Sequence, residues 1–260
     1  TRSPGACREA FVIELERVPG SPRPGTGQAL AGMAVVDLTP PPGLAMAGFS
    51  TEGAVAREAR DPLCARALVL QDASGRAVAL CVLDLMTSSR YLHERAGALA
   101  AERCGLGVGE LVLCATHTHF APGNVHGNRL YDTFAQARIG FDRGLADWLA
   151  EGVARAVAEA VERLEPARLG VGRRTLWGMA KNASMPAFER NPEAATWEGE
   201  GHPGHGAPAD LDPAWRAIDP RVTALAAVGE GGHLIGSWAS FGTHCTALGI
   251  RETRYAADWA

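Results

Sequence analysis

The chain is organised around the stretch Cys114-Ala115-Thr116-His117-Thr118-His119-Phe120-Ala121-Pro122-Gly123. The apolar run before it, Leu111-Val112-Leu113, predicts a buried strand, and the proline and glycine at its end predict a loop. Histidines one residue apart at a strand end point to the same side, so His117 and His119 can converge on one ion. Neutral imidazole is a good zinc ligand. The alternative is a hydrogen-bonded core histidine beside a solvent-facing one, because a lone His-x-His motif is short.

The composition indicates a globular protein of nearly balanced charge. The 260 residues are 47% hydrophobic, which suffices for one large domain or two small ones. The 25 basic and 29 acidic residues argue against a nucleic-acid partner. No apolar stretch reaches the roughly 20 residues of a transmembrane segment, and residues 1–30 lack the apolar core of a signal peptide. The 6 cysteines form no Cys-x-x-Cys pair, and their positions favour a reduced compartment.

The hydrophobic pattern predicts an α/β fold, with mixed β-sheet layers flanked by helices in a single domain. Strands are expected at 32–38, 64–71, 77–85, 111–113, 167–176, 222–228 and 233–241, and helices at 89–103 and 142–164. The second helix has a stripe with a period of about 3.6 residues, which predicts packing on the sheet. Its members are Leu145, Trp148, Leu149, Val153, Val157, Val161 and Leu164.

Two segments lack a regular pattern. Residues 1–30 are rich in proline, glycine and arginine, and are expected to be a disordered or processed leader. Residues 183–221 contain many prolines and form a long irregular insertion, which is expected to be functional or disordered. Residues 31–260 then form the folded domain. This domain is expected to be incomplete at its C-terminal end, because no terminating signal follows Tyr255.

Two further polar residues follow apolar strands. Asp84 ends the strand at 77–85, where a carboxylate is either a site residue or the N-cap of the next helix. The serines at 88 and 89 compete for that cap. His244 follows the last strand, in the same setting as the first histidine pair. Alone it would be read as a hydrogen-bonded core histidine, but with His117 and His119 it becomes a candidate ligand.

Several motifs occur together in a characteristic order. They are Asp37-Leu38-Thr39-Pro40-Pro41-Pro42-Gly43, Gly48-Phe49, Asp61-Pro62-Leu63-Cys64-Ala65-Arg66-Ala67, Asp84, the histidine stretch, Gly242-Thr243-His244-Cys245-Thr246 and Ala257-Asp258. In this order, the segment from about Gly32 to Ala260 resembles the N-terminal catalytic region of the neutral/alkaline non-lysosomal ceramidase family. The histidine stretch is similar to that family's Ala-Thr-His-Thr-His-Ser-Gly-Pro-Gly.

The resemblance implies an α/β fold and zinc-dependent hydrolysis of an amide in a sphingolipid, with a lipid or small-molecule amide as the substrate. It makes His117 and His244 the ligands of Zn²⁺, and His119 a residue that orients the substrate. His119 is also the best candidate to take a proton from water, with Asp84 and Asp258 as further candidates. In the alternative, Asp258 orients His244. The remaining ligands, an acidic residue and a tyrosine, are expected beyond Ala260. Family members generally act outside the cell or at membranes.

Two departures from the family pattern bear on the substrate. The family's Asn-Arg-Ser-Pro is here Asn182-Ala183-Ser184-Met185, so the arginine is absent while Ser184 stays a candidate site residue. The serine after the histidine pair is Phe120. Alanine cannot replace the fork of donors of a guanidinium. A zinc hydrolase of a non-lipid amide or ester is therefore a second hypothesis, and a non-catalytic or incomplete homologue that acts as a binding protein is a third.

Overall fold

A computed structural model describes residues 17–259 of the chain. Within them a seven-stranded sheet has the order β5-β4-β3-β1-β6-β7-β8, and β2 pairs with β9 separately. The strands are β1 (Leu30–Asp37), β2 (Glu58–Ala59), β3 (Cys64–Gln71), β4 (Ala77–Leu83), β5 (Leu111–Ala115), β6 (Glu165–Thr175), β7 (Arg221–Gly229), β8 (Leu234–Phe241) and β9 (Arg254–Tyr255). The helices are α1 (Arg90–Cys104), α2 (Tyr131–Phe134), α3 (Arg143–Glu162), α4 (Met185–Phe188) and α5 (Pro213–Arg216), with 3-10 turns η1 (Ser50–Glu52) and η2 (Pro192–Thr196). The predicted α/β fold with a mixed sheet is confirmed.

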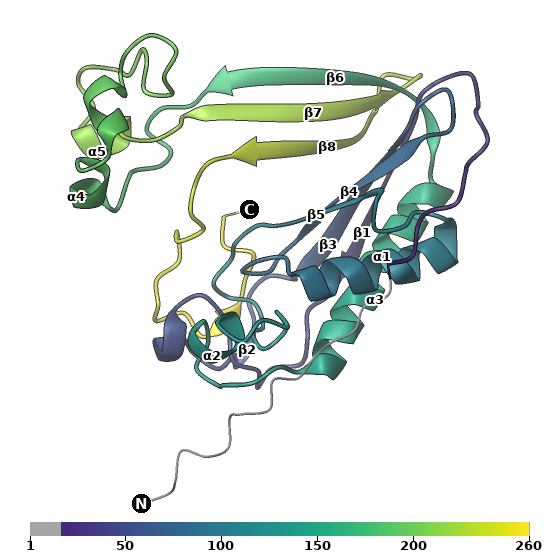
Figure 1. Ribbon diagram of the computed structural model, residues 1–260, viewed down its shortest axis with the longest axis horizontal. Coiled ribbons are helices and arrows are strands. Elements are labelled where there is room, and N and C mark those ends of the chain that lie inside the picture. The colour runs from purple at the N-terminus through teal and green to yellow at the C-terminus, as the bar shows by residue number, and fades with distance from the viewer. Residues whose placement is uncertain (1–16, 260) are drawn as a thin grey trace, which may run out of the picture.

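Half of the sheet is a compact layer under two helices. Strands β1, β3 and β4 pair antiparallel, whereas β4 and β5 pair parallel. A parallel pair needs a crossover connection, and α1 supplies it. In Figure 1, α1 and α3 lie side by side over the layer that these strands form. This arrangement brings the ends of β4 and β5 together at one edge of the layer.

The two long helices have clear start and stop residues. The Ser89 hydroxyl accepts a hydrogen bond from Leu92 N at 3.2 Å, so Ser89 is the N-cap of α1. The interpretation of Asp84 as this cap is therefore wrong. Gly105 ends α1 in the left-handed conformation, with φ 76°. Asp142 caps α3 by accepting from Leu145 N at 2.9 Å.

The core lies between α3 and the sheet. Leu149, Val153 and Val157 are at most 1% exposed, as the stripe predicted. Trp148 is an exception, because it is 42% exposed. It lies one position, about 100° around the helix, from Leu149, and the buried arc is completed instead by alanines. These are Ala146, Ala150, Ala154, Ala156 and Ala160.

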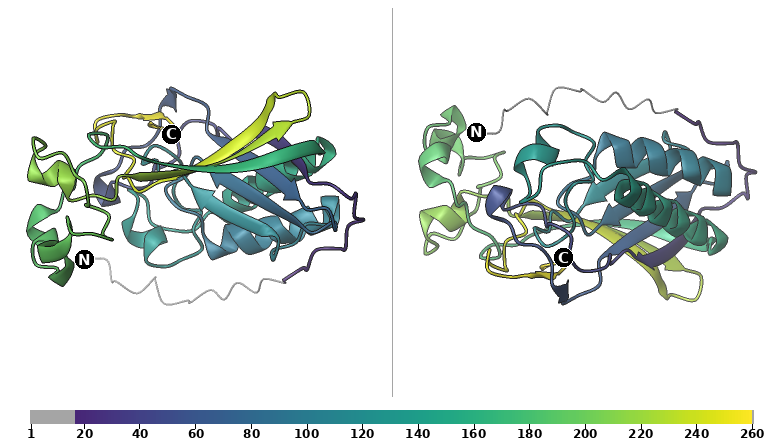
Figure 2. Two further views of the ribbon diagram at one scale, coloured as in Figure 1. Left: turned by 90° about the horizontal axis from the view of Figure 1, so that it is seen from above. Right: turned by 90° about the horizontal axis from the view of Figure 1, so that it is seen from below.

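The other half of the sheet is a long arm. Strand β6 pairs with β1 only over two residues at its start and then continues with β7 and β8 as an antiparallel ribbon. Figures 1 and 2 show α4 and α5 clustered at the far end of this ribbon. The insertion at 183–221, predicted to be irregular, thus contains the short helices α4 and α5 and the turn η2. Proline is the first residue of both α5 and η2, a position whose backbone N–H has no partner within the helix, so its absence costs little.

The expected leader is only partly described, because residues 1–16 lie outside the described residues. Residues 17–29 have no helix or strand, yet they are not free of the domain. Ser21 N donates to Gly105 O at 2.8 Å, and Arg23 donates to Gln71 Oε1 at 2.7 Å and to Cys104 O at 3.0 Å. Part of this segment therefore contacts the domain, and both the leader at residues 1–30 and a domain boundary at residue 31 stay predictions. Between residues 17 and 259, no helix has the length and hydropathy to cross a membrane.

Candidate metal centre

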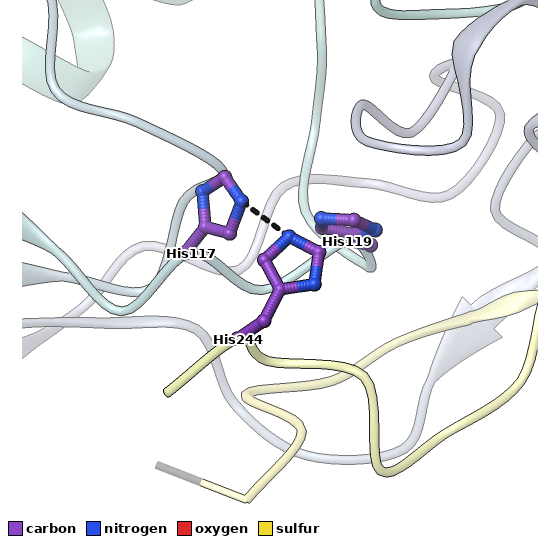
Figure 3. Close-up of side chains that lie close together, drawn as sticks. All are labelled: His117, His119 and His244. Atoms are coloured by element: carbon purple, nitrogen blue, oxygen red, sulfur yellow. Dashed lines mark hydrogen bonds between the residues drawn. The ribbon is translucent and has the colours of Figure 1, made fainter. Parts of the chain in front are cut away.

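Three histidines from two distant parts of the chain meet at one point. His117 comes two residues after β5, and His244 comes three residues after β8. Their Nε2 atoms are 2.8 Å apart, and one ring nitrogen from each of His117, His119 and His244 lies within 4.8 Å of the others. Figure 3 shows the three rings facing one another. The expected convergence is present, but for a different reason, since β5 ends at Ala115 and His117 has φ 64° rather than a strand conformation.

The orientation of His117 is set by a backbone carbonyl. Its Nδ1 lies 2.5 Å from Met86 O. A carbonyl oxygen can only accept, so Nδ1 carries the proton and Nε2 keeps its lone pair. The residue before it is also fixed, because Thr116 N donates to Leu83 O at 2.9 Å. The lone pair of His117 thus points toward His244, which is the arrangement that a histidine ligand needs.

His119 lies on the buried side of the cluster. It is 6% exposed, and its ring makes an edge contact with Phe49, with centroids 4.8 Å apart. Gly48 lies directly against the same ring, at φ 120°, where a side chain would collide with it. Burial, followed by the nearby His117 and His244, lowers the pKa of His119 to about 4. Within residues 17–259, no group bonds its buried Nδ1, which leaves a ring nitrogen without a hydrogen-bond partner.

His244 is the exposed member of the cluster. Burial of part of its ring and the neighbouring His117 lower its pKa, while the charge of Asp258 opposes this shift. Histidine binds a metal in its neutral form, and a lowered pKa favours that form. The donor set fits Zn²⁺, because neutral imidazoles are among its preferred ligands. The Nε2 lone pair of His117, which faces His244, and the unpartnered Nδ1 of His119 are the observations that support this fit.

Asp84 does not lie among the histidines. It is 1% exposed, and its Oδ2 accepts from Cys64 N at 2.8 Å and from Arg66 Nη1 at 2.7 Å. These contacts connect the end of β4 to β3. Asp84 is therefore not the helix cap, and its site role stays a prediction, since its Oδ1 is buried without a hydrogen-bond partner among residues 17–259.

Asp258 lies near enough to His244 for its charge to act on that ring, whereas Ser184 lies in the arm. Asp258, at φ 66°, accepts from Leu248 N at 3.0 Å, and burial raises its pKa. Between residues 17 and 259 it makes no hydrogen bond to His244, although its charge acts on that ring. Ser184 is exposed and precedes α4 at the far end of the arm. No hydrogen bond joins it to the histidines in the described part of the chain. Site roles for both stay predictions.

Several groups around the site were missed by sequence reasoning. The Met86 carbonyl has no sequence signal, because every residue carries one. Gly48-Phe49 was singled out only as a motif, and the structure places this pair against His119. Phe120, which stands where the similar family has serine, is 0% exposed and packs on Phe49 at 5.5 Å between ring centroids. Phe120 thus belongs to the core behind the site.

Comparisons with known proteins agree with the resemblance. The family model described as neutral/alkaline non-lysosomal ceramidase, N-terminal, matches residues 30–259. A neutral ceramidase of Pseudomonas aeruginosa is 28% identical over 187 residues, 71% of this chain and 25% of that protein. One of Oryza sativa subsp. japonica is 22% identical over 245 residues, 89% of this chain and 29% of that protein.

A solved structure extends this similarity to the fold. The crystal structure of neutral ceramidase from Pseudomonas aeruginosa superposes with a TM-score of 0.74 and 26% identity, covering 88% of this chain and 34% of that one. The chain therefore spans about a quarter to a third of the length of the relatives that it matches.

Proposed function

The chain belongs to the neutral/alkaline non-lysosomal ceramidase family, and we propose that it carries the histidine part of a zinc-dependent amidohydrolase site. The observation that supports this proposal is the 2.8 Å approach of His117 Nε2 to His244 Nε2, with His119 beside them. The proposed substrate is the N-acyl amide of a sphingolipid, in line with the name neutral ceramidase that the relatives carry.

Each histidine has a distinct role in this proposal. His117 and His244, whose Nε2 atoms face each other, would hold a zinc ion, and an ion held there would supply Lewis-acid chemistry for the activation of water and of the amide carbonyl. His119 is neutral near neutral pH, so it can accept a proton from water or, in its protonated form, donate to the leaving amine. Asp258 stays the alternative proton acceptor.

The substrate of the proposed hydrolase is a separate question, and two observations favour a second class of substrate. Ala183 stands where the similar family has an arginine, and it is exposed in the arm. Phe120 replaces a serine and is buried in the core. Neither replacement side chain can offer a hydrogen bond to a substrate. The second candidate is therefore the same hydrolytic site acting on a non-lipid amide or ester; a non-catalytic binding homologue is the remaining alternative.

The test is the zinc content of the purified protein, measured by mass spectrometry of the metal. Wild type is compared with His117→Ala and His244→Ala, and with His233→Ala as a control. His233 is an exposed histidine of the β7–β8 turn that pairs with Glu165. We expect about one zinc per chain in wild type and the control and a loss in the other two variants. An unchanged zinc content in those two variants would contradict the assignment.

Hydrolysis of an N-acylsphingosine by the zinc-loaded protein then tests the substrate.

A further inference from the structure

The end of β4 contacts His117 at two points. Leu83 O accepts from Thr116 N at 2.9 Å, and Met86 O lies 2.5 Å from His117 Nδ1. The first contact continues the parallel β4–β5 pairing, in which Leu83 faces Ala115. The second contact lies past the end of β4, where no strand pairing fixes the backbone. The position of the Met86 carbonyl must therefore depend on what holds residues 84–86.

Asp84 is the residue that anchors this segment. Its main-chain N donates to Cys64 O at 3.0 Å, and its side chain accepts from Cys64 N at 2.8 Å. These two hydrogen bonds extend the antiparallel β3–β4 pairing by one residue past Leu83 and Ala65. Arg66, from the next position on the same face of β3, adds a 2.7 Å ion pair to the same oxygen. A charge-assisted contact of this kind is stronger than a neutral hydrogen bond.

We propose that Asp84, held by Arg66, is a positioning residue that fixes the Met86 carbonyl and thereby the metal-binding tautomer of His117. Asp84 lies two positions before Met86 in the chain, and its printed contacts are with β3, whereas the His117 ring contacts the Met86 carbonyl. A carbonyl in this place keeps the proton on Nδ1, which leaves Nε2 free to face His244. The metal part of this proposal rests on the proposed function, whereas the tautomer part concerns the metal-free protein.

The first experiment reads the tautomer directly. Proton–nitrogen correlation spectra of the ¹⁵N-labelled, metal-free protein distinguish a protonated Nδ1 from a protonated Nε2. We expect the Nδ1–H form for His117 in wild type. In Asp84→Asn, which cannot form the ion pair, and in Arg66→Met we expect a mixture of both forms. Arg66 has a side chain that is 34% exposed, so its replacement is the milder change and remains informative if Asp84→Asn does not fold.

The second experiment measures zinc affinity by competition with a chelator. Loss of a group that orients a ligand histidine typically weakens metal binding by about 10- to 100-fold, and we expect this range for Asp84→Asn. The matched control is Asp147→Asn, which removes the contacts of another carboxylate with Tyr91 and Arg95, between α1 and α3. It should change stability and leave both the tautomer of His117 and the zinc affinity as in wild type.

The outcomes separate this proposal from the proposed function. An Nδ1–H form in wild type that becomes a mixture of both tautomers in the two variants supports positioning by Asp84. The same tautomer in wild type, Asp84→Asn and Arg66→Met overturns it, whatever the zinc result. A wild-type protein that binds no zinc overturns the proposed function alone, because the tautomer spectra still decide the role of Asp84.

Discussion

His117 and His244 are 127 positions apart in the chain, and their Nε2 atoms lie 2.8 Å from each other. The two residues follow strands from different halves of the sheet, β5 in the helix-covered layer and β8 in the arm. The short approach therefore depends on how the arm is set against the layer. Two nitrogen lone pairs in such proximity repel each other unless a proton or a cation lies between them.

Removal of zinc is expected to lower the stability of the protein. A ligand that binds only the folded state stabilises it by about 2.7 kcal/mol at 100 times its Kd, which is a Tm shift of about 5–10 °C for a domain of this size. Thermal unfolding with added zinc and with EDTA measures the shift. We expect it in wild type and in His233→Ala. His117→Ala should unfold at one temperature in both conditions, and a zinc shift equal to that of wild type in this variant would contradict the site.

Replacement of Gly48 by alanine is expected to disturb His119. Gly48 has φ 120°, and a Cβ there would collide with the imidazole ring. Gly43 is the matched control, since its φ is 106° and a Cβ there would meet nothing within 4 Å. Both changes carry a backbone strain of about 1–3 kcal/mol. Urea unfolding should show the larger loss of unfolding free energy for Gly48→Ala. Equal losses of unfolding free energy in Gly48→Ala and Gly43→Ala would mean that the His119 ring can move aside without cost.

Restoration of the family's serine at Phe120 is expected to destabilise the fold. Phe120 is 0% exposed and lies against Phe49, so Phe120→Ser leaves a cavity and buries a hydroxyl. Truncation of a buried phenylalanine costs about 3–5 kcal/mol. Phe134→Ser is the control, because Phe134 is 59% exposed and should stay within about 0.5 kcal/mol of wild type. Chemical denaturation measures both. A Phe120→Ser protein as stable as wild type would argue against a core role.

Thiol reactivity should follow burial. Desolvation, and then the nearby Cys114, raise the pKa of Cys81 to about 12. A thiol with this pKa is ionised in about one molecule per thousand at pH 9, and only the thiolate reacts. Iodoacetamide at pH 9, followed by peptide mass spectrometry, should therefore modify the half-buried Cys104 before Cys81. In urea the two cysteines should react alike. Rapid labelling of Cys81 in the folded protein would contradict its burial.

The sequence alone determined the elements and their order. Apolar periodicity is a local property, so α1, α3 and the seven strands of the large sheet could be located to within a few residues, whereas the two-residue strands β2 and β9 were missed. The buried positions of Leu149 and Val153 followed from the same stripe. Trp148 was wrongly predicted to be buried. Alanines, which are only weakly hydrophobic and so do not stand out in a periodicity pattern, form much of the buried face of α3 instead. The histidine stretch and His244 were also identified as candidate ligands from their place at strand ends.

Only the tertiary structure decided how these residues meet. The approach of His117 to His244 requires β4–β5 pairing on one side and the path of the β6–β8 arm on the other, and neither is a property of a short segment. The Met86 carbonyl that orients His117 is a backbone group, which residue types cannot reveal. The contacts of Asp84 with β3, in place of the expected cap, likewise depend on a residue 20 positions away. Local patterns thus specified the parts of the site, whereas strand pairing over long distances in the chain set its geometry.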